Sequence, residues 1–218
     1  MKASVIDVDR VINVIHRRCN SQGVTLEWKP GAATAYTNGK NIVIPAVSQP
    51  ISQEQLETLY GFIVHECGHH SRPEAFSILN SAQPCEALAA MMNIIEDDGM
   101  ERAVSKDYLG DRKALGVSNN ITLNQAGTHF KTMQDKADPE ATEAQMAPLA
   151  VTALGQLSRI EWDSYSNEGR ADFFNYMHPV AKKLTDTLVK EGWVDKMRNT
   201  KTPHDTWDVA VDLFKRLY

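Results

Sequence analysis

The stretch LETLYGFIVHECGHH, residues 56–70, decides how this chain folds and which chemistry it can support. It contains an H-E-x-x-H motif, His65-Glu66-Cys67-Gly68-His69. On an α-helix, positions i and i+4 lie on one face, one turn apart, so both imidazoles can bind a single Zn²⁺. Glu66 then lies close enough to act on a water at the metal. The stretch therefore predicts a helix built around a zinc site.

Signals on either side set the bounds of this helix at residues 52–72. Residues 52–55, SQEQ, form a capping box at its start. Arg72-Pro73 ends it, because the residue before a proline disfavours the helical conformation. An apolar stripe at helical spacing faces the core, and we expect Cys67 in it to be a buried small hydrophobe. The stripe consists of Leu56, Leu59, Tyr60, Ile63 and Cys67.

The residues before this helix predict an N-terminal helix followed by a small sheet. Apolar residues at helical spacing over residues 4–19 indicate the helix. The pattern then alternates over residues 24–28, which is typical of a strand, and residues 33–37 form a weaker second strand. Asn38-Gly39 is a hairpin signal, and residues 41–45, NIVIP, form a third strand. We therefore expect a three-stranded sheet directly before the motif helix.

The end of the third strand bears on how a substrate could bind. Pro45 ends this strand and is compatible with the edge of a sheet. An exposed edge can hold an extended peptide by main-chain hydrogen bonds. We therefore expect the hairpin of residues 33–45 to flank the metal site and to offer Ile42–Ile44 as that edge.

A catalytic zinc needs a third protein ligand, and the best candidate segment is MNIIEDDGMER, residues 92–102. It lies on a helix predicted over residues 85–105, which would run back across the motif helix. Three successive carboxylates, Glu96-Asp97-Asp98, repel one another unless a cation lies nearby. We choose Glu96 as the third ligand. Asp97 is the alternative, and otherwise a carboxylate that orients an imidazole.

The rest of the chain predicts helices alone. A short helix is expected over residues 74–80, and after residue 107 only helical patterns occur, separated by prolines and glycines. The fold class is therefore α+β and mostly helical. Residues 1–106 would form the core that holds the H-E-x-x-H motif, and residues 107–218 a helical subdomain of the same fold.

Two motifs together resemble a known family. The combination of His65-Glu66-Cys67-Gly68-His69 with Asn93-Ile94-Ile95-Glu96-Asp97 and the following Met100-Glu101 is similar to the metallopeptidase-like N-terminal region of the CobT-type family. That family includes a cobaltochelatase subunit and many bacterial and phage proteins, whose members carry H-E-x-x-H and N-x-x-E-D-x-R-x-E. This chain has Gly99 where the pattern has arginine, so it resembles a divergent copy, over about residues 33–104.

The resemblance implies a zincin-like fold with a gluzincin-like site. It carries two histidines and one glutamate over to His65, His69 and Glu96 as zinc ligands. Family members often add a von Willebrand A-type domain with a D-x-S-x-S metal motif. That motif does not occur in this sequence, so the resemblance does not imply a chelatase role.

Composition narrows the classes of function. The net charge of −5 and the lack of a dense Lys/Arg block argue against nucleic acid as a partner. No apolar run approaches the length of a membrane span, and the N-terminus lacks the apolar region of a secretory signal. Three cysteines without a C-x-x-C pair indicate a reducing compartment, so we expect a cytoplasmic protein.

We expect a zinc-dependent metallopeptidase that hydrolyses peptide bonds through a zinc-activated water, with Glu66 as the general base. Its expected partners are a peptide or protein substrate and, as a further option, a separate partner protein. The alternative is a non-catalytic protein-binding module on a peptidase-like zinc scaffold, which the small size of the chain favours. The sequence does not rank the donors for an oxyanion, which include His129, Tyr165, Tyr176, His178 and His204.

Overall fold

The computed structural model describes most of the chain. The described positions are 10, 13–14, 16–17, 19, 23–32, 35–37, 39–46, 51–107, 109–133, 138, 140–159 and 167–218. Of the helix expected over residues 4–19, the described positions 10, 13, 14, 16, 17 and 19 are helical. The other positions of that helix, and residues 33 and 34 of the expected second strand, lie outside the described residues.

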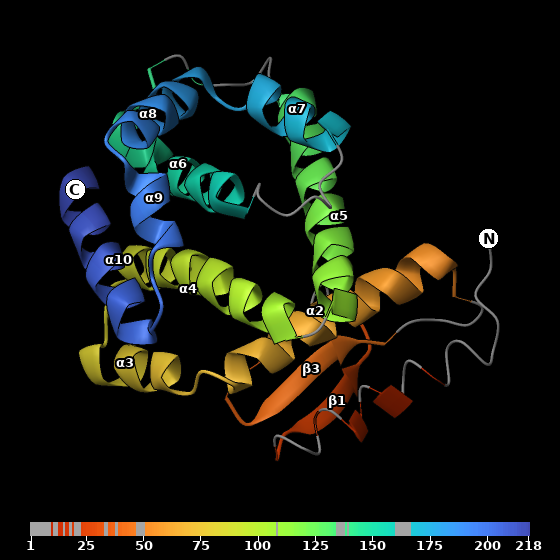
Figure 1. Cartoon of the computed structure of the whole chain (residues 1–218). Helices are drawn as coiled ribbons and strands as arrows, with labels where there is room; N and C mark the ends of the chain where they lie inside the picture. The colour runs from red at the N-terminus through yellow and green to blue at the C-terminus, as the bar shows by residue number, and fades with distance from the viewer. Residues whose placement is uncertain are drawn as a thin grey trace.

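The described part of the chain is a mostly helical α+β structure, with a three-stranded sheet followed by nine helices (Figure 1). The strands are β1 (Thr25–Lys29), β2 (Tyr36–Thr37) and β3 (Asn41–Pro45). The helices are α2 (Gln53–His70), α3 (Glu74–Ala82), α4 (Glu86–Asp107), α5 (Leu109–Met133), α6 (Glu143–Ser158), α7 (Asn167–Tyr176), α8 (Pro179–Lys190), α9 (Trp193–Arg198) and α10 (Pro203–Leu217). The predicted mostly helical α+β class and the predicted pair of long helices are confirmed.

The strand order corrects one prediction. The sheet runs β1-β3-β2, with β1 parallel and β2 antiparallel to β3. The prediction that Ile42–Ile44 form an open edge is wrong, because β3 is hydrogen-bonded on both sides and these residues are buried. Three consecutive apolar residues are typical of a strand covered on both faces, and that signal outweighs the proline at the end. The short strand β2 lies at an edge of this sheet.

Helix α2 begins where the sequence predicts. The side chain of Ser52 accepts from the backbone N–H of Gln55, and the Gln55 side chain accepts from the backbone N–H of Ser52, so the capping box is formed. The apolar stripe of α2 packs against the sheet in one core cluster that includes Ile42, Ile44, Leu59, Ile63 and Cys67. Cys67 is fully buried, as expected.

Two glycines let other helices approach α2. A side chain at Gly61 would collide with the backbone carbonyl of Ala114 on α5, and one at Gly68 would collide with Met100 on α4. Glycine in a helix interior costs about 1 kcal/mol relative to alanine, and close packing of α4 and α5 explains why it occurs here. Both long helices therefore lie directly against the motif helix.

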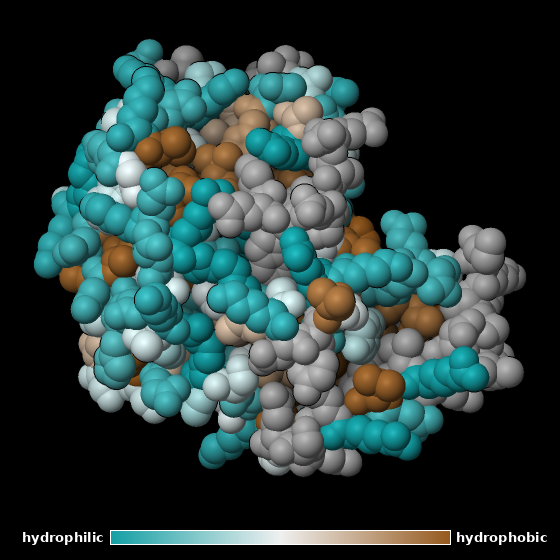
Figure 2. All heavy atoms as spheres, viewed as in Figure 1, coloured by the Kyte–Doolittle hydropathy of each residue, from teal (hydrophilic) through white to brown (hydrophobic). Residues whose placement is uncertain are grey.

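The remaining helices enclose α4. Figure 1 shows α4 crossing the molecule from α10 and α3 toward α2, while α5 extends from α2 to α7. One core cluster joins buried residues of α3 and α4 with residues of α6, α8, α9 and α10. The face seen in Figure 2 is largely hydrophilic with separate apolar patches. Among the described helices, none combines the length and the apolar character that crossing a lipid bilayer requires.

Candidate metal centre

The last two turns of α2 bring the two motif histidines together. The Nε2 atoms of His65 and His69 lie 3.2 Å apart, and their rings are nearly perpendicular. Two such nitrogens that face each other need a shared proton or a cation between them, because each carries a lone pair directed at the other. Their side chains are 22% and 11% exposed, so the pair reaches solvent at one side.

The third group at this point is Asp97 on α4. Its Oδ1 lies 3.6 Å from the Nε2 of His65 and 3.3 Å from that of His69. Within the described residues, this oxygen is buried and has no hydrogen-bond partner. His65, His69 and Asp97 thus form a group that could hold a metal ion.

The separations among the three ligand atoms fit a small tetrahedral ion. Zn²⁺ binds nitrogen and oxygen at about 2.0–2.1 Å, so its ligand atoms lie about 3.3–3.4 Å apart in a tetrahedral site. The separations in this cluster are 3.2, 3.3 and 3.6 Å. Two imidazoles and one carboxylate are also the donor set that zinc takes in hydrolytic sites. The structure therefore offers three ligands in a usable arrangement.

The residue chosen from the sequence as third ligand, Glu96, lies elsewhere. Its carboxylate is paired with Arg72, with Nε to Oε1 at 2.6 Å and a hydrogen bond from Nη2 to Oε2 at 3.1 Å. Burial raises the pKa of Glu96, and Arg72 and Thr206 oppose that rise. Successive helical residues point about 100° apart, so Glu96 and Asp97 cannot face the same neighbour. The structure brings the alternative, Asp97, to the imidazoles instead.

His65 is oriented by a carboxylate that the sequence analysis did not assign. Its Nδ1 donates a hydrogen bond of 2.8 Å to Oε1 of Glu101, which is buried on α4. Burial raises the pKa of Glu101, but Arg159 and His65 outweigh burial and lower it, so the carboxylate is ionised. The Nδ1 proton fixes the tautomer that leaves Nε2 free to bind a cation. The i, i+4 spacing of Asp97 and Glu101 is the sequence signal for this role.

Arg159, directly after α6, connects the acidic side of the site. Its Nε donates to Oε2 of Glu101 at 2.9 Å, and its Nη2 lies 3.5 Å from Oδ2 of Asp97. The guanidinium is buried, so these charges interact with little screening by water. Nothing local in the sequence identifies this residue, because it lies 58 positions from Glu101 along the chain.

Glu66 is buried beside the two imidazoles. Burial raises the pKa of its carboxyl, and the two imidazoles and the backbone N–H of Thr37 oppose that rise. A carboxyl with a raised pKa is better matched to accepting a proton near neutral pH.

Two of the ligand candidates, His65 and Asp97, carry opposite charges in the absence of a metal. Burial lowers the pKa of His65, but the surrounding carboxylates, Asp97 first, outweigh burial and raise it to about 9. Burial raises the pKa of Asp97, but the two imidazoles and Arg159 lower it to about 2. A protonated His65 therefore neutralises Asp97, and a bound cation would take over that task from the proton.

The hairpin flanks the site, as predicted, but through β2. The Oγ1 of Thr37 lies 2.7 Å from Nε2 of His70. Since Thr37 already donates its hydroxyl proton to the carbonyl of Asn41, the His70 ring donates to Thr37. Strand β2 and the end of α2 are thus joined next to the motif.

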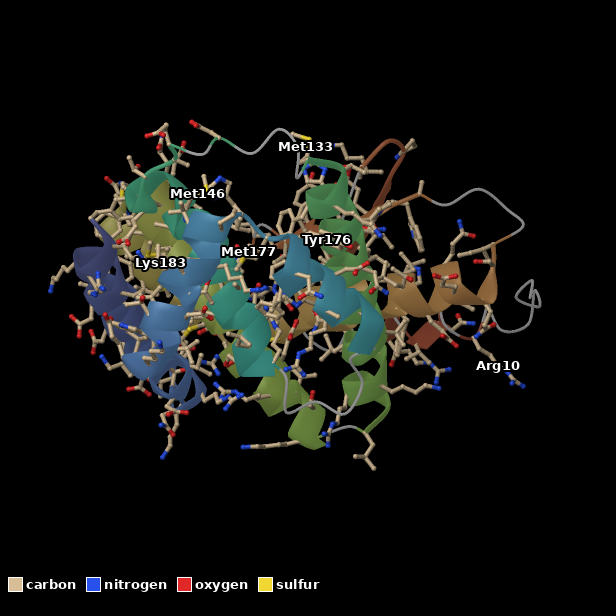
Figure 3. All side chains as sticks on the ribbon, turned by 90° about the horizontal axis from the view of Figure 1, so that it is seen from above. Arg10, Met133, Met146, Tyr176, Met177 and Lys183 are labelled. Carbon is tan, nitrogen blue, oxygen red and sulfur yellow. The ribbon has the colours of Figure 1, made fainter. Side chains whose placement is uncertain are left out.

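Three of the described oxyanion candidates, His129, Tyr176 and His178, make contacts away from the motif. His178 caps α8 by accepting from the N–H of Val180. Tyr176, labelled in Figure 3, ends α7, and Nζ of Lys131 lies 5.1 Å from its ring centroid. His129 packs against Phe130. Tyr165 lies outside the described residues.

Comparison with known proteins gives no relative. No family model matches the chain, and neither the curated proteins nor the solved structures contain a match.

Proposed function

We propose that this chain is a zinc-dependent metallopeptidase with a zincin-like site. The observation that carries the proposal is the convergence of three donor atoms, Nε2 of His65, Nε2 of His69 and Oδ1 of Asp97, beside the buried Glu66. The motif resemblance to the CobT-type family supports the same activity and is part of the proposal. A glutamate next to the ligands favours catalysis, because a purely structural site has no use for a base there.

In this proposal His65, His69 and Asp97 hold the ion, and Glu66 moves the proton. Zinc bound in such a site polarises a carbonyl and makes a neighbouring water more acidic. Glu66 accepts the proton that this water loses and returns it to the leaving amine. Glu101 keeps the His65 ring in the tautomer that the metal needs.

The proposed substrate is an extended peptide. Strand β2 lies at a sheet edge, and its Thr37 contacts His70 at the end of the motif helix. A peptide added along such an edge would run past the motif helix and bring a peptide bond to the metal. The correction from β3 to β2 therefore keeps the predicted binding mode and changes the strand that provides it.

A non-catalytic zinc-binding scaffold is the second candidate. The observation in its favour is burial: the side chains of His69 and Asp97 are only 11% and 15% exposed, as in a closed structural site. A scaffold of this kind would bind zinc and need no proton transfer. The two candidates therefore differ in what Glu66 is for.

The test measures zinc content and cleavage of an unfolded protein in wild type and Glu66→Gln. The peptidase proposal expects about one zinc per chain in both, and cleavage that falls 10²- to 10⁴-fold in the variant. Glu54→Gln, at an exposed position of the same helix, is the matched control and should keep both properties. Wild type that binds zinc but cleaves no member of a broad peptide library would support the scaffold instead.

A further inference from the structure

The two oxygens of Asp97 have different surroundings. Oδ1 faces the imidazoles and has no hydrogen-bond partner among the described residues. Oδ2 lies 3.5 Å from Nη2 of Arg159 and 3.5 Å from Nδ2 of Asn93. Two donors therefore hold one oxygen, and the other remains directed at the metal position.

Arg159 is itself held in place. Its Nε donates to Oε2 of Glu101 at 2.9 Å, and Oε1 of the same carboxylate accepts from His65. Asp97, Arg159, Glu101 and His65 thus form a ring of contacts. Arg159 links the carboxylates of Asp97 and Glu101, Glu101 binds His65, and His65 lies beside Asp97. A second support for Glu101 comes from Nδ2 of Asn119, at 3.1 Å. Because these contacts restrain the guanidinium of Arg159, it can hold Asp97 in one orientation.

The other carboxylates of the acidic run are arranged differently. Arg72 contacts both oxygens of Glu96. On Asp98, Arg102 and Ser158 both contact Oδ2, and the carboxylate points away from the imidazoles. Each of the three acids thus has its own arginine, and the arginine of Asp97 is the one that links its carboxylate to a histidine-bound glutamate.

We propose that Arg159 is a positioning residue that keeps Asp97 a one-oxygen ligand. By holding Oδ2, it prevents the carboxylate from turning both oxygens toward the ion. With two imidazoles and one carboxylate oxygen, a zinc site keeps one position for a water or substrate oxygen. If both carboxylate oxygens bound, that position would be crowded. This inference rests on the proposed metal site and adds which residue controls its coordination.

The test uses Co²⁺ in place of zinc, because its visible absorption is strong in four-coordinate sites and weaker when the coordination number rises. We expect wild type to bind one Co²⁺ with a four-coordinate spectrum, and Arg159→Met to bind it with weaker visible bands. Zinc affinity of the variant, measured by competition with a chromophoric chelator, should fall about 10- to 100-fold, as when other residues that orient ligands are removed. Arg159→Lys should restore part of the spectrum.

Two further variants keep the test decisive. Arg102→Met removes another arginine that pairs with the acidic run, at Asp98, and should leave the cobalt spectrum unchanged. Asn93→Leu removes the second donor to Oδ2 at an exposed position, so it tests the same idea if Arg159→Met does not fold. We expect a smaller change of the same kind in this variant.

The outcomes separate the two proposals. Wild-type spectra and zinc affinity in both Arg159→Met and Asn93→Leu would overturn the role of Arg159 and leave the metal site standing. An equal spectral change in Arg102→Met would also overturn it, since loss of any arginine beside the acidic run would then suffice. Wild type that binds neither Co²⁺ nor Zn²⁺ would overturn the metal site itself.

Discussion

The two helices that meet at the metal site hold their site residues in different ways. Helix α2 is fixed by apolar packing on the sheet and by glycines that admit its neighbours. Helix geometry places its two histidines on one face, and Glu101 of α4 orients the ring of His65. Helix α4 contributes three carboxylates that pair with arginines: Arg72 and Arg159 come from other parts of the chain, and Arg102 lies on α4 itself. Substitutions in α2 should therefore affect the protein mainly through packing, whereas substitutions in α4 should affect it mainly through charge.

The largest expected effect separates the neighbours Asp97 and Glu96. Asp97→Ala should lose the bound zinc, because one of three ligands is gone. Glu96→Ala should keep it but lose roughly 3 kcal/mol of stability, since Arg72, whose side chain is only 11% exposed, is left without its partner. Metal analysis and urea unfolding of both variants give the comparison. Zinc lost from Glu96→Ala and kept in Asp97→Ala would return the third ligand to the residue chosen from the sequence.

The next effect concerns packing of α2. Gly61→Ala should destabilise the chain by roughly 3 kcal/mol, near the upper end of overpacking, because the backbone carbonyl of Ala114 cannot turn away. Gly68→Ala meets the side chain of Met100 instead, which is flexible, and should cost less. Thermal unfolding of the two variants tests the order. Equal losses would show that Met100 is as rigid as the backbone.

A smaller effect is expected on the acidic side of the site. Glu101→Gln should weaken zinc binding about 10- to 100-fold while leaving all three ligands present, because the amide orients His65 less well than the carboxylate. Chelator competition measures the affinity. Glu191→Gln, which removes a carboxylate paired with Arg216 at an exposed position, is the control and should bind zinc normally. Unchanged affinity in Glu101→Gln would limit that residue to a structural role.

The smallest effect is a pH dependence of the metal-free chain. The folded pKa of His65, about 9, lies above its ordinary value of 6.5, so its stabilisation is complete below pH 6.5 and is lost as pH rises through about 9. The folded pKa of Asp97, about 2, lies below 3.8, so its contribution is present above pH 3.8 and is lost toward pH 2. His65 and Asp97 therefore both stabilise the fold between pH 3.8 and pH 6.5.

Urea unfolding in chelator should show a loss of about 1–2 kcal/mol between pH 6.5 and 9. With zinc present, the trend should reverse, because the metal competes with the proton on His65 and binds better at higher pH. His65→Ala should flatten both profiles. A metal-free wild-type chain that gains stability over this window would contradict the charge arrangement of the cluster.

Local signals predicted the parts of the fold that depend on neighbours in the chain. The capping box at Ser52 and the stop after His70 depend on residues within one helical turn of each end. The spacing of apolar residues, together with the prolines and glycines between segments, predicted the strand at residues 41–45 and the absence of described strands beyond residue 107. The strand order did not follow from local signals, because β1 pairs in parallel with β3 although β2 lies between them in the sequence.

The sequence by itself determined that His65 and His69 share one face and that Glu66 stands between them, because the geometry of a single helix sets these relations. The tertiary structure alone decided which acid completes the group. Adjacent carboxylates on α4 point about 100° apart, so the rotation at which that helix packs on α2 decides whether Glu96 or Asp97 faces the imidazoles. It also brought Arg159 to both Asp97 and Glu101, a relation between distant segments that only the packing of α6 on α4 creates.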